Sequence, residues 1–130
     1  MAEFTFDHMH LRSPDPEATA AFYERMFGAE ILRSVQGGQP RIDLKLGGVD
    51  VFLMAGSNVG PAPAHPHRGL DHFGLRVNGI DAVVAELKAK GVHFTMEPTT
   101  VRPGVRVAFL RAPDDVSIEL LDRNPSHKVG

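Results

Sequence analysis

The chain has 130 residues, 42% of them hydrophobic, which is enough to bury the core of one domain. Its net charge of −2 offers no basic surface for nucleic acid, and the lack of cysteine excludes disulfides, thiolate metal sites and a cysteine nucleophile. No apolar run could span a bilayer, and the first residues lack the layout of a signal peptide, so a cytoplasmic protein is expected.

The first half of the chain is predicted to fold in the order βαβββ. Residues 5–12 alternate between two faces, as in a strand. Asp15 before Pro16 is typical of a helix start, and Gly28 is typical of a helix end. The helix is expected to bury Ala18, Ala21, Phe22 and Met26. Three strands should follow, at about 31–35, 41–46 and 49–54.

The second half is predicted to repeat this order after a linker at 56–69. A strand at 70–77 precedes a helix that ends at Gly91. The helix has helical spacing of its apolar residues Ile80, Val83, Val84 and Leu87. Three strands should follow, at about 93–97, 105–111 and 116–121. We therefore expect a single domain, 1–130, with module one at about 4–55, module two at about 70–122, and a tail at 123–130.

The two halves also match in sequence. The segment DHMHLR that starts at Asp7 returns as DHFGLR at Asp71, 64 positions later, with four of six residues identical. The strand at 49–54 likewise aligns with the one at 116–121. Approximate symmetry between the halves would give four side chains equivalent places: His8, His72, Glu119 and Phe52. Three of these four are metal ligands by chemistry, so the repeat itself indicates a candidate active site.

Two βαβββ modules with these Asp-His openings resemble the vicinal oxygen chelate superfamily. This superfamily includes glyoxalase I, methylmalonyl-CoA epimerase, extradiol dioxygenases, fosfomycin-resistance enzymes and metal-free bleomycin-binding proteins. Further marks are AFYERMFG at residues 21–28 and PDD at 113–115 before Glu119, and the resemblance covers about 4–122. It implies an α+β fold in which the modules form a curved mixed-sheet cup, a small-molecule substrate and a homodimer. The cup could form within one chain or across the dimer.

By this resemblance, His8, His72 and Glu119 fall on the family's metal positions. Two imidazoles and a carboxylate suit a divalent metal, Fe(II) being favoured here and Mn, Co, Ni or Zn also suited. The plainer alternative is that both histidines are ordinary polar residues and that the glutamate faces solvent. Phe52 departs from the pattern, because glyoxalase-like and epimerase-like members usually place a fourth ligand, Glu or Gln, there. Either three protein ligands remain, as in facial-triad iron sites, or a water fills the fourth place.

Other residues of the expected site follow from strand alternation. His10 shares a face with His8, where its imidazole could act as a catalytic acid or base or could simply form part of the pocket wall. A largely apolar substrate pocket is expected from Phe52, Met54, Val107 and Phe109. Core packing is the alternative for these four residues.

The leading hypothesis is a metal-dependent oxygenase resembling extradiol dioxygenases, acting on an aromatic or polycyclic substrate with vicinal oxygens. The main alternative is a glyoxalase-like or epimerase-like lyase or isomerase, which needs a base beside the metal. Because Phe52 removes the usual carboxylate, His10 would supply that base. A fosfomycin-type transferase ranks lower, because residues 101–105 lack the serines of its cation loop. A metal-free small-molecule-binding protein would not need the intact ligand set.

Overall fold

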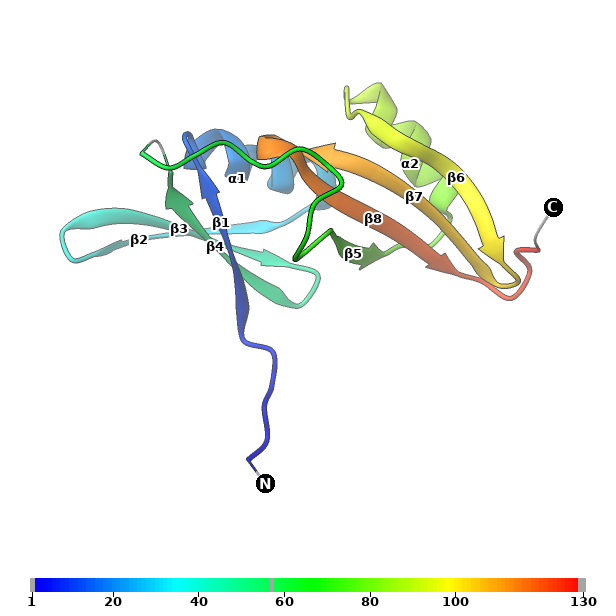
Figure 1. Ribbon diagram of the computed structural model, residues 1–130, viewed down its shortest axis with the longest axis horizontal. Helices are drawn as coiled ribbons and strands as arrows, with labels where there is room; N and C mark the ends of the chain where they lie inside the picture. The colour runs from blue at the N-terminus through cyan, green and yellow to red at the C-terminus, as the bar shows by residue number, and fades with distance from the viewer. Residues whose placement is uncertain (1, 57, 129–130) are drawn as a thin grey trace. The chain divides into compact units, whose positions relative to one another are not determined.

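The chain divides into two compact units, Met1–Gly60 (unit 1) and Pro61–Gly130 (unit 2). The computed structural model describes residues 2–56 and 58–128. Each unit contains one helix and one mixed sheet of four strands, in the order βαβββ along the chain (Figure 1). The predicted α+β class of two tandem modules is confirmed.

Unit 1 consists of β1 (His8–Ser13), α1 (Pro16–Phe27), β2 (Glu30–Gln36), β3 (Gln39–Leu46) and β4 (Val49–Ala55). The strands lie in the order β1-β4-β3-β2. β1 is parallel to β4, and the other two pairs are antiparallel. Short glycine turns join β2 to β3 and β3 to β4. β1 and β2 lie at opposite edges of the sheet, and α1 connects them across it.

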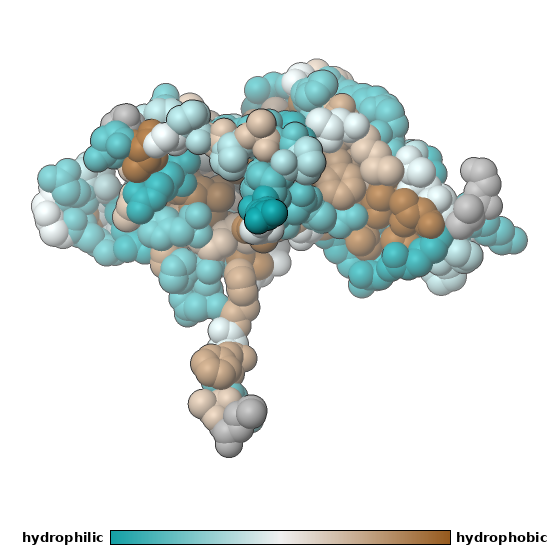
Figure 2. Space-filling view, in the orientation of Figure 1, coloured by the Kyte–Doolittle hydropathy of each residue, from teal (hydrophilic) through white to brown (hydrophobic). Residues whose placement is uncertain are grey.

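β1 begins at His8 rather than at residue 5. Its single partner, β4, begins at Val49, and His8 is already level with Asp50, so earlier residues have no strand to pair with. Figure 1 shows the chain before β1 running away from the sheet, and Figure 2 colours this segment mostly brown. Phe4 and Phe6 in it are 93% and 71% exposed.

The limits of α1 follow the predicted signals, but its buried face does not. The Asp15 carboxylate accepts a hydrogen bond from the Ala18 N–H, and Gly28 ends the helix with a φ of 71°. The helix buries Thr19, Ala20 and Tyr23. Of the four residues predicted to be buried, Phe22 and Met26 are half-buried, whereas Ala18 and Ala21 are exposed, so the prediction was wrong for these two alanines. The buried Thr19 hydroxyl pairs with Ser13, which makes a polar residue acceptable on that face.

Unit 2 consists of β5 (Phe73–Arg76), α2 (Ile80–Ala89), β6 (Phe94–Arg102), β7 (Val105–Ala112) and β8 (Val116–Arg123). A short 3₁₀ turn at Pro113–Asp115 joins the last two strands. The sheet has the order β5-β8-β7-β6, which matches the topology of unit 1. β5 is parallel to β8, as β1 is to β4.

Two strands of unit 2 differ from their predicted limits. β5 begins at Phe73, so His72 lies just before the strand rather than within it. β6 continues past Pro98 to Arg102, although proline lacks the N–H that a central strand needs. β6 is the edge of its sheet and shifts register between Met96 and Thr99, and both features allow a proline there.

The sheet of each unit has one face against its helix and one open face. In unit 1, Leu44, Val51 and Leu53 are buried where α1 packs on β3 and β4. In unit 2, Ile118 and Leu120 are buried on the side of α2. Because strand residues alternate between faces, Phe52 and Glu119 lie on the open faces. The open faces therefore carry the predicted site residues.

The N-terminus of α2 is capped by a buried carboxylate from a distant strand, because its own N-cap residue, Gly79, has no side chain to accept a hydrogen bond. Asp122, 2% exposed, accepts hydrogen bonds from the N–H groups of Gly79 and Ile80 at 3.0 and 3.1 Å, and His127 Nε2 lies 3.3 Å away. Burial alone raises its pKa, but these contacts prevail and hold the pKa of Asp122 below its ordinary value. Neither helix of the described chain has the length and apolar character to cross a membrane.

Candidate functional site

The strand registers match the sequence repeat. In unit 1, His10 on β1 is paired with Phe52 on β4. In unit 2, Gly74 on β5 is paired with Glu119 on β8. His10 and Gly74 are themselves equivalent in the repeat, so Phe52 and Glu119 hold the same place in their sheets. The equivalence predicted from sequence is thus a property of the fold.

Unit 2 brings two of the predicted ligands together. His72 Nε2 lies 3.4 Å from Glu119 Oε1, and the two side chains are 31% and 21% exposed. On the other side of the ring, His72 Nδ1 lies 2.7 Å from a carboxylate oxygen of Asp71. This hydrogen bond lowers the pKa of Asp71 below its ordinary value, against a smaller opposing effect of burial.

The geometry of this pair fits a divalent metal. The Asp71 carboxylate can only accept, so Nδ1 carries the proton and Nε2 of a neutral His72 presents its lone pair to Glu119. Two lone-pair atoms at 3.4 Å repel each other unless a cation lies between them. Ligand atoms about 2.1 Å from one metal at angles of about 90–109° lie about 3.0–3.4 Å apart. A proton on Nε2 would satisfy the same contact.

Unit 1 contains a similar histidine beside a different neighbour. His8 Nδ1 lies 2.7 Å from Asp7, so its Nε2 is also left free by the tautomer. The His8 ring stacks on Phe52, with the ring centroids 4.1 Å apart and the planes inclined by 25°. An aromatic ring therefore contacts His8 at the position where a carboxylate contacts His72.

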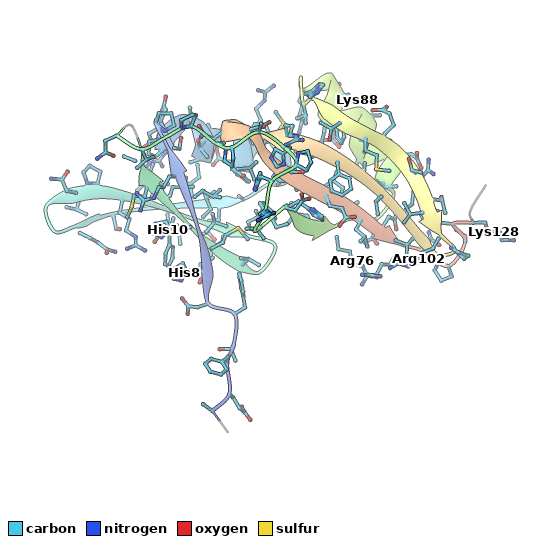
Figure 3. All side chains as sticks on the ribbon, in the orientation of Figure 1. His8, His10, Arg76, Lys88, Arg102 and Lys128 are labelled. Atoms are coloured by element: carbon cyan, nitrogen blue, oxygen red, sulfur yellow. The ribbon has the colours of Figure 1, made fainter. Side chains whose placement is uncertain are left out.

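His10 and Arg41 complete this part of the open face of unit 1. The His10 ring lies edge-on to both His8 and Phe52, with centroids 6.0 and 5.8 Å away. Figure 3 shows His8 and His10 along β1. Arg41, on β3, places its guanidinium carbon 4.4 Å from the Phe52 centroid and donates to Asp43. Phe52 is thus held by groups from the strands on either side of β4.

A cavity of about 710 Å³ opens beside these rings in unit 1. It is lined by His10, Phe52 and Met54, by prolines and aliphatic side chains, and by polar and charged residues of α1, β2 and β3. Both arginines in its wall are paired with carboxylates, Arg33 with Glu17 and Arg41 with Asp43. The Asp15 carboxylate in the wall accepts a hydrogen bond at the start of α1. The cavity therefore offers a mixed surface with an apolar, aromatic part at Phe52 and Met54, and its size suits a small-molecule ligand.

The two remaining predicted pocket residues lie in unit 2. Phe109 is the cross-strand partner of Glu119 and meets the His72 ring edge-on at 4.9 Å. It also lines a smaller cavity of about 370 Å³ with Arg111 and Ser117. Val107 lies on the same face as Phe109 but is only 4% exposed, so it packs within the unit.

Sequence reasoning missed three residues of this arrangement. Asp7 and Asp71 contact the two histidines, and the signal was present, because both copies of the repeat begin with Asp-His. Arg41 had no comparable signal, since its contact with Phe52 depends on the register between β3 and β4.

The predicted ligand set draws on both units. Taken unit by unit, the described residues contain no group of three histidine, aspartate or glutamate side chains that could hold a metal. His72 and Glu119 form a pair in unit 2, and His8 stands alone as a ligand in unit 1. Their joint action on one metal is therefore a proposal.

Comparison with known proteins finds matches that span both units. The model of the Glyoxalase/Bleomycin resistance protein/Dioxygenase superfamily matches residues 5–120. A probable lactoylglutathione lyase of Vibrio cholerae is 27% identical over 92% of this chain and 91% of its own length. A lactoylglutathione lyase of Arabidopsis thaliana is 28% identical over 93% of this chain, which spans only 45% of that plant protein.

Solved structures share the fold at low sequence identity. A glyoxylase/bleomycin resistance protein/dioxygenase domain from Frankia sp. superimposes with a TM-score of 0.76 at 21% identity, over 97% of this chain and 96% of that one. The fosfomycin resistance protein FosX from Listeria monocytogenes superimposes with a TM-score of 0.73 at 20% identity, over 97% and 94% of the two chains. At these identities, the likeness extends to the fold alone.

Proposed function

Because this chain belongs to the Glyoxalase/Bleomycin resistance protein/Dioxygenase superfamily, we propose that it is a metal-dependent lyase or isomerase of the glyoxalase type. Its reaction would move a proton between neighbouring oxygen-bearing carbons of a small molecule. The observation that carries the proposal is the Vibrio cholerae relative, a probable lactoylglutathione lyase matched over nearly the whole length of both chains. This favours the lyase alternative over the oxygenase that led the sequence interpretation.

The proposed metal ligands are His8 from unit 1 and His72 with Glu119 from unit 2. The close approach of His72 Nε2 to Glu119 Oε1 supports the pair, and the free Nε2 of His8 supports the third ligand. Two imidazoles and a carboxylate suit several divalent ions, so the identity of the metal is left to measurement. Such an ion, when bound, acts as a Lewis acid that polarises the substrate carbonyl and stabilises the negative charge developing on its oxygen.

His10 is the proposed base. It shares the open face of unit 1 with His8 and lines the larger cavity, where it can reach a bound substrate. Among the residues that the structure describes, its imidazole makes ring contacts but no hydrogen bond, so a ring nitrogen is available to take a proton. The same nitrogen can return the proton to the adjacent carbon, so no net proton is gained or lost.

The substrate's organic group is proposed to occupy the cavity beside Phe52 and Met54. Since both arginines of the wall are already paired with carboxylates, this part of the wall favours an apolar or aromatic group over an anionic one. In this proposal, the bound substrate presents its neighbouring oxygens to the metal ligands and its organic side group to the cavity. Partnership in a homodimer stays a prediction.

One observation favours a second candidate, the extradiol-type dioxygenase. Phe52 takes the place of a possible fourth ligand, and a three-ligand centre leaves more positions open for a chelating substrate and dioxygen. An aromatic cavity also suits a phenolic substrate. The two candidates differ in what they consume, because only the oxygenase uses dioxygen.

The test begins with the full chain loaded separately with Zn(II), Ni(II), Co(II) or, under anaerobic conditions, Fe(II). One assay follows thioester formation from glutathione mixed with methylglyoxal or phenylglyoxal. The other assay follows dioxygen uptake with catechols and polycyclic phenols. We expect thioester formation that requires metal, with no substrate-dependent dioxygen uptake.

Ligand variants and a matched control complete this experiment. His72→Ala and Glu119→Ala should abolish both metal binding and turnover, whereas His93→Ala, at an exposed position of the same unit, should change neither. Dioxygen uptake with iron would overturn the lyase proposal in favour of the oxygenase. Binding of the small molecules without any metal or turnover would indicate a binding protein instead.

A further inference from the structure

We propose that Asp7 and Asp71 are matched positioning residues that orient His8 and His72 for metal binding. This inference rests on the proposed metal site and concerns how its two imidazoles are held. Each aspartate lies immediately before its histidine, one in each unit, and each places a carboxylate oxygen 2.7 Å from Nδ1.

The two contacts are not an automatic result of neighbouring positions. Consecutive residues of a strand point to opposite faces, so an aspartate inside the strand would point away from the following histidine. Asp7 lies just before β1, which begins at His8, and Asp71 lies before β5, which begins at Phe73. Outside the strand, each carboxylate can turn back onto the ring.

Neither aspartate has a visible role in holding its unit together. Their side chains are 87% and 57% exposed. Among residues 2–56 and 58–128, neither carboxylate has a hydrogen-bond partner other than its histidine. The same contact recurs in both units at the start of the repeated six-residue segment, which points to a shared task at the rings.

The task follows from the chemistry of imidazole. A carboxylate that accepts the Nδ1 proton fixes the tautomer, so Nε2 always presents its lone pair, and it limits rotation of the ring. Acting on both histidines, the aspartates prepare two of three ligands before a metal arrives.

The test measures metal affinity rather than turnover. Zn(II) dissociation constants are measured by competition with a chromophoric chelator for wild type, Asp7→Ala, Asp71→Ala and the double variant. Each alanine variant should bind Zn(II) about 10–100-fold more weakly, and the two losses should multiply in the double variant. Melting temperatures of the metal-free proteins should match wild type, which a structural role for the aspartates would not allow.

Two further sets of variants separate orientation from net charge. Asp71→Asn keeps an oxygen that can accept from Nδ1, so its loss of affinity should be smaller than that of Asp71→Ala. Asp50→Asn removes a carboxylate level with His8 on the neighbouring strand, where it pairs with Lys45, and Asp114→Asn removes one in unit 2. These two controls should bind Zn(II) like wild type. Equal losses in the controls would reduce the effect to charge and overturn the inference.

The outcome also distinguishes this inference from the proposed function. If His72→Ala and Glu119→Ala lose the metal while Asp7→Ala and Asp71→Ala bind it as tightly as wild type, the metal site stands and the positioning role is wrong. If the ligand variants keep full metal affinity, the proposed site is wrong and the inference falls with it.

Discussion

Phe52 and Glu119 occupy the same place in two sheets of identical topology. Each is the strand partner, in a parallel pair, of the residue that lies two positions after a histidine of the repeat. Glu119 lies within 3.4 Å of its histidine, whereas Phe52 stacks on its histidine with centroids 4.1 Å apart. One half thus offers a histidine and a carboxylate, and the other offers a histidine alone.

Phe52→Glu is expected to add a fourth ligand to the proposed metal site. A carboxylate at position 52 would stand beside His8 as Glu119 stands beside His72. Zn(II) affinity should rise about tenfold or more, and the electronic spectrum of the Co(II) protein should change with its coordination. Phe52→Leu, which removes the ring without adding a ligand, should not raise the affinity. An unchanged dissociation constant and spectrum in Phe52→Glu would show that position 52 does not face the metal.

His10→Gln should lower kcat by about 10²–10⁴-fold while leaving the metal content unchanged. Glutamine keeps hydrogen-bonding groups in the cavity wall but cannot take a proton near neutral pH. Steady-state kinetics on the metal-loaded protein, with metal analysis of the same sample, separates the two effects. His93→Gln, at an exposed position, serves as the matched control. Wild-type turnover in His10→Gln would assign the base to another group.

Much of the fold could be predicted because its local signals agree. Asp15, Pro16 and Gly28 mark α1 with side-chain and backbone chemistry that depends on nothing outside the helix. The strand limits depended on partners instead, and this is why β1 starts at His8 and β6 continues beyond Pro98. The buried face of α1 was predicted only in part, because the Thr19 hydroxyl has a partner, Ser13, that periodicity alone does not show.

The candidate site likewise has features that the sequence predicts and features that depend on packing. The equivalence of Phe52 and Glu119 could be predicted because the two halves align in sequence. The strand registers of β1 with β4 and of β5 with β8 agree with this alignment. The ligand set predicted from the resemblance already grouped Glu119 with His72, but their 3.4 Å approach depends on rotamers as well as register and could not be predicted. Arg41 lies eight positions before the aligned segment 49–54, and only the pairing of β3 with β4 brings it to Phe52.

Met54→Lys should weaken the binding of substrates with a large apolar group. Met54 is 42% exposed and lines the cavity with Phe52, so a lysine there brings a charge into an apolar wall. We expect kcat/KM to fall about 10–100-fold for the phenylglyoxal adduct and much less for the methylglyoxal adduct. Val35→Lys, on exposed β2 outside the cavity lining, should affect neither. Equal losses on both substrates would place the side group elsewhere.

Asp122→Ala should destabilise unit 2 by about 1–3 kcal/mol, because the N–H groups of Gly79 and Ile80 lose their buried acceptor at the start of α2.

The stabilisation that Asp122 contributes should also depend on pH. The pKa of Asp122 is lower in the folded state than its ordinary value of 3.8, so its stabilisation is present above that value and is lost as the pH falls through the folded pKa. Urea unfolding at pH 7 and at successively lower pH values, in wild type and Asp122→Asn, measures this difference. The advantage of wild type over Asp122→Asn should shrink below about pH 4, and a constant advantage down to pH 2 would show that ionised Asp122 does not stabilise the fold.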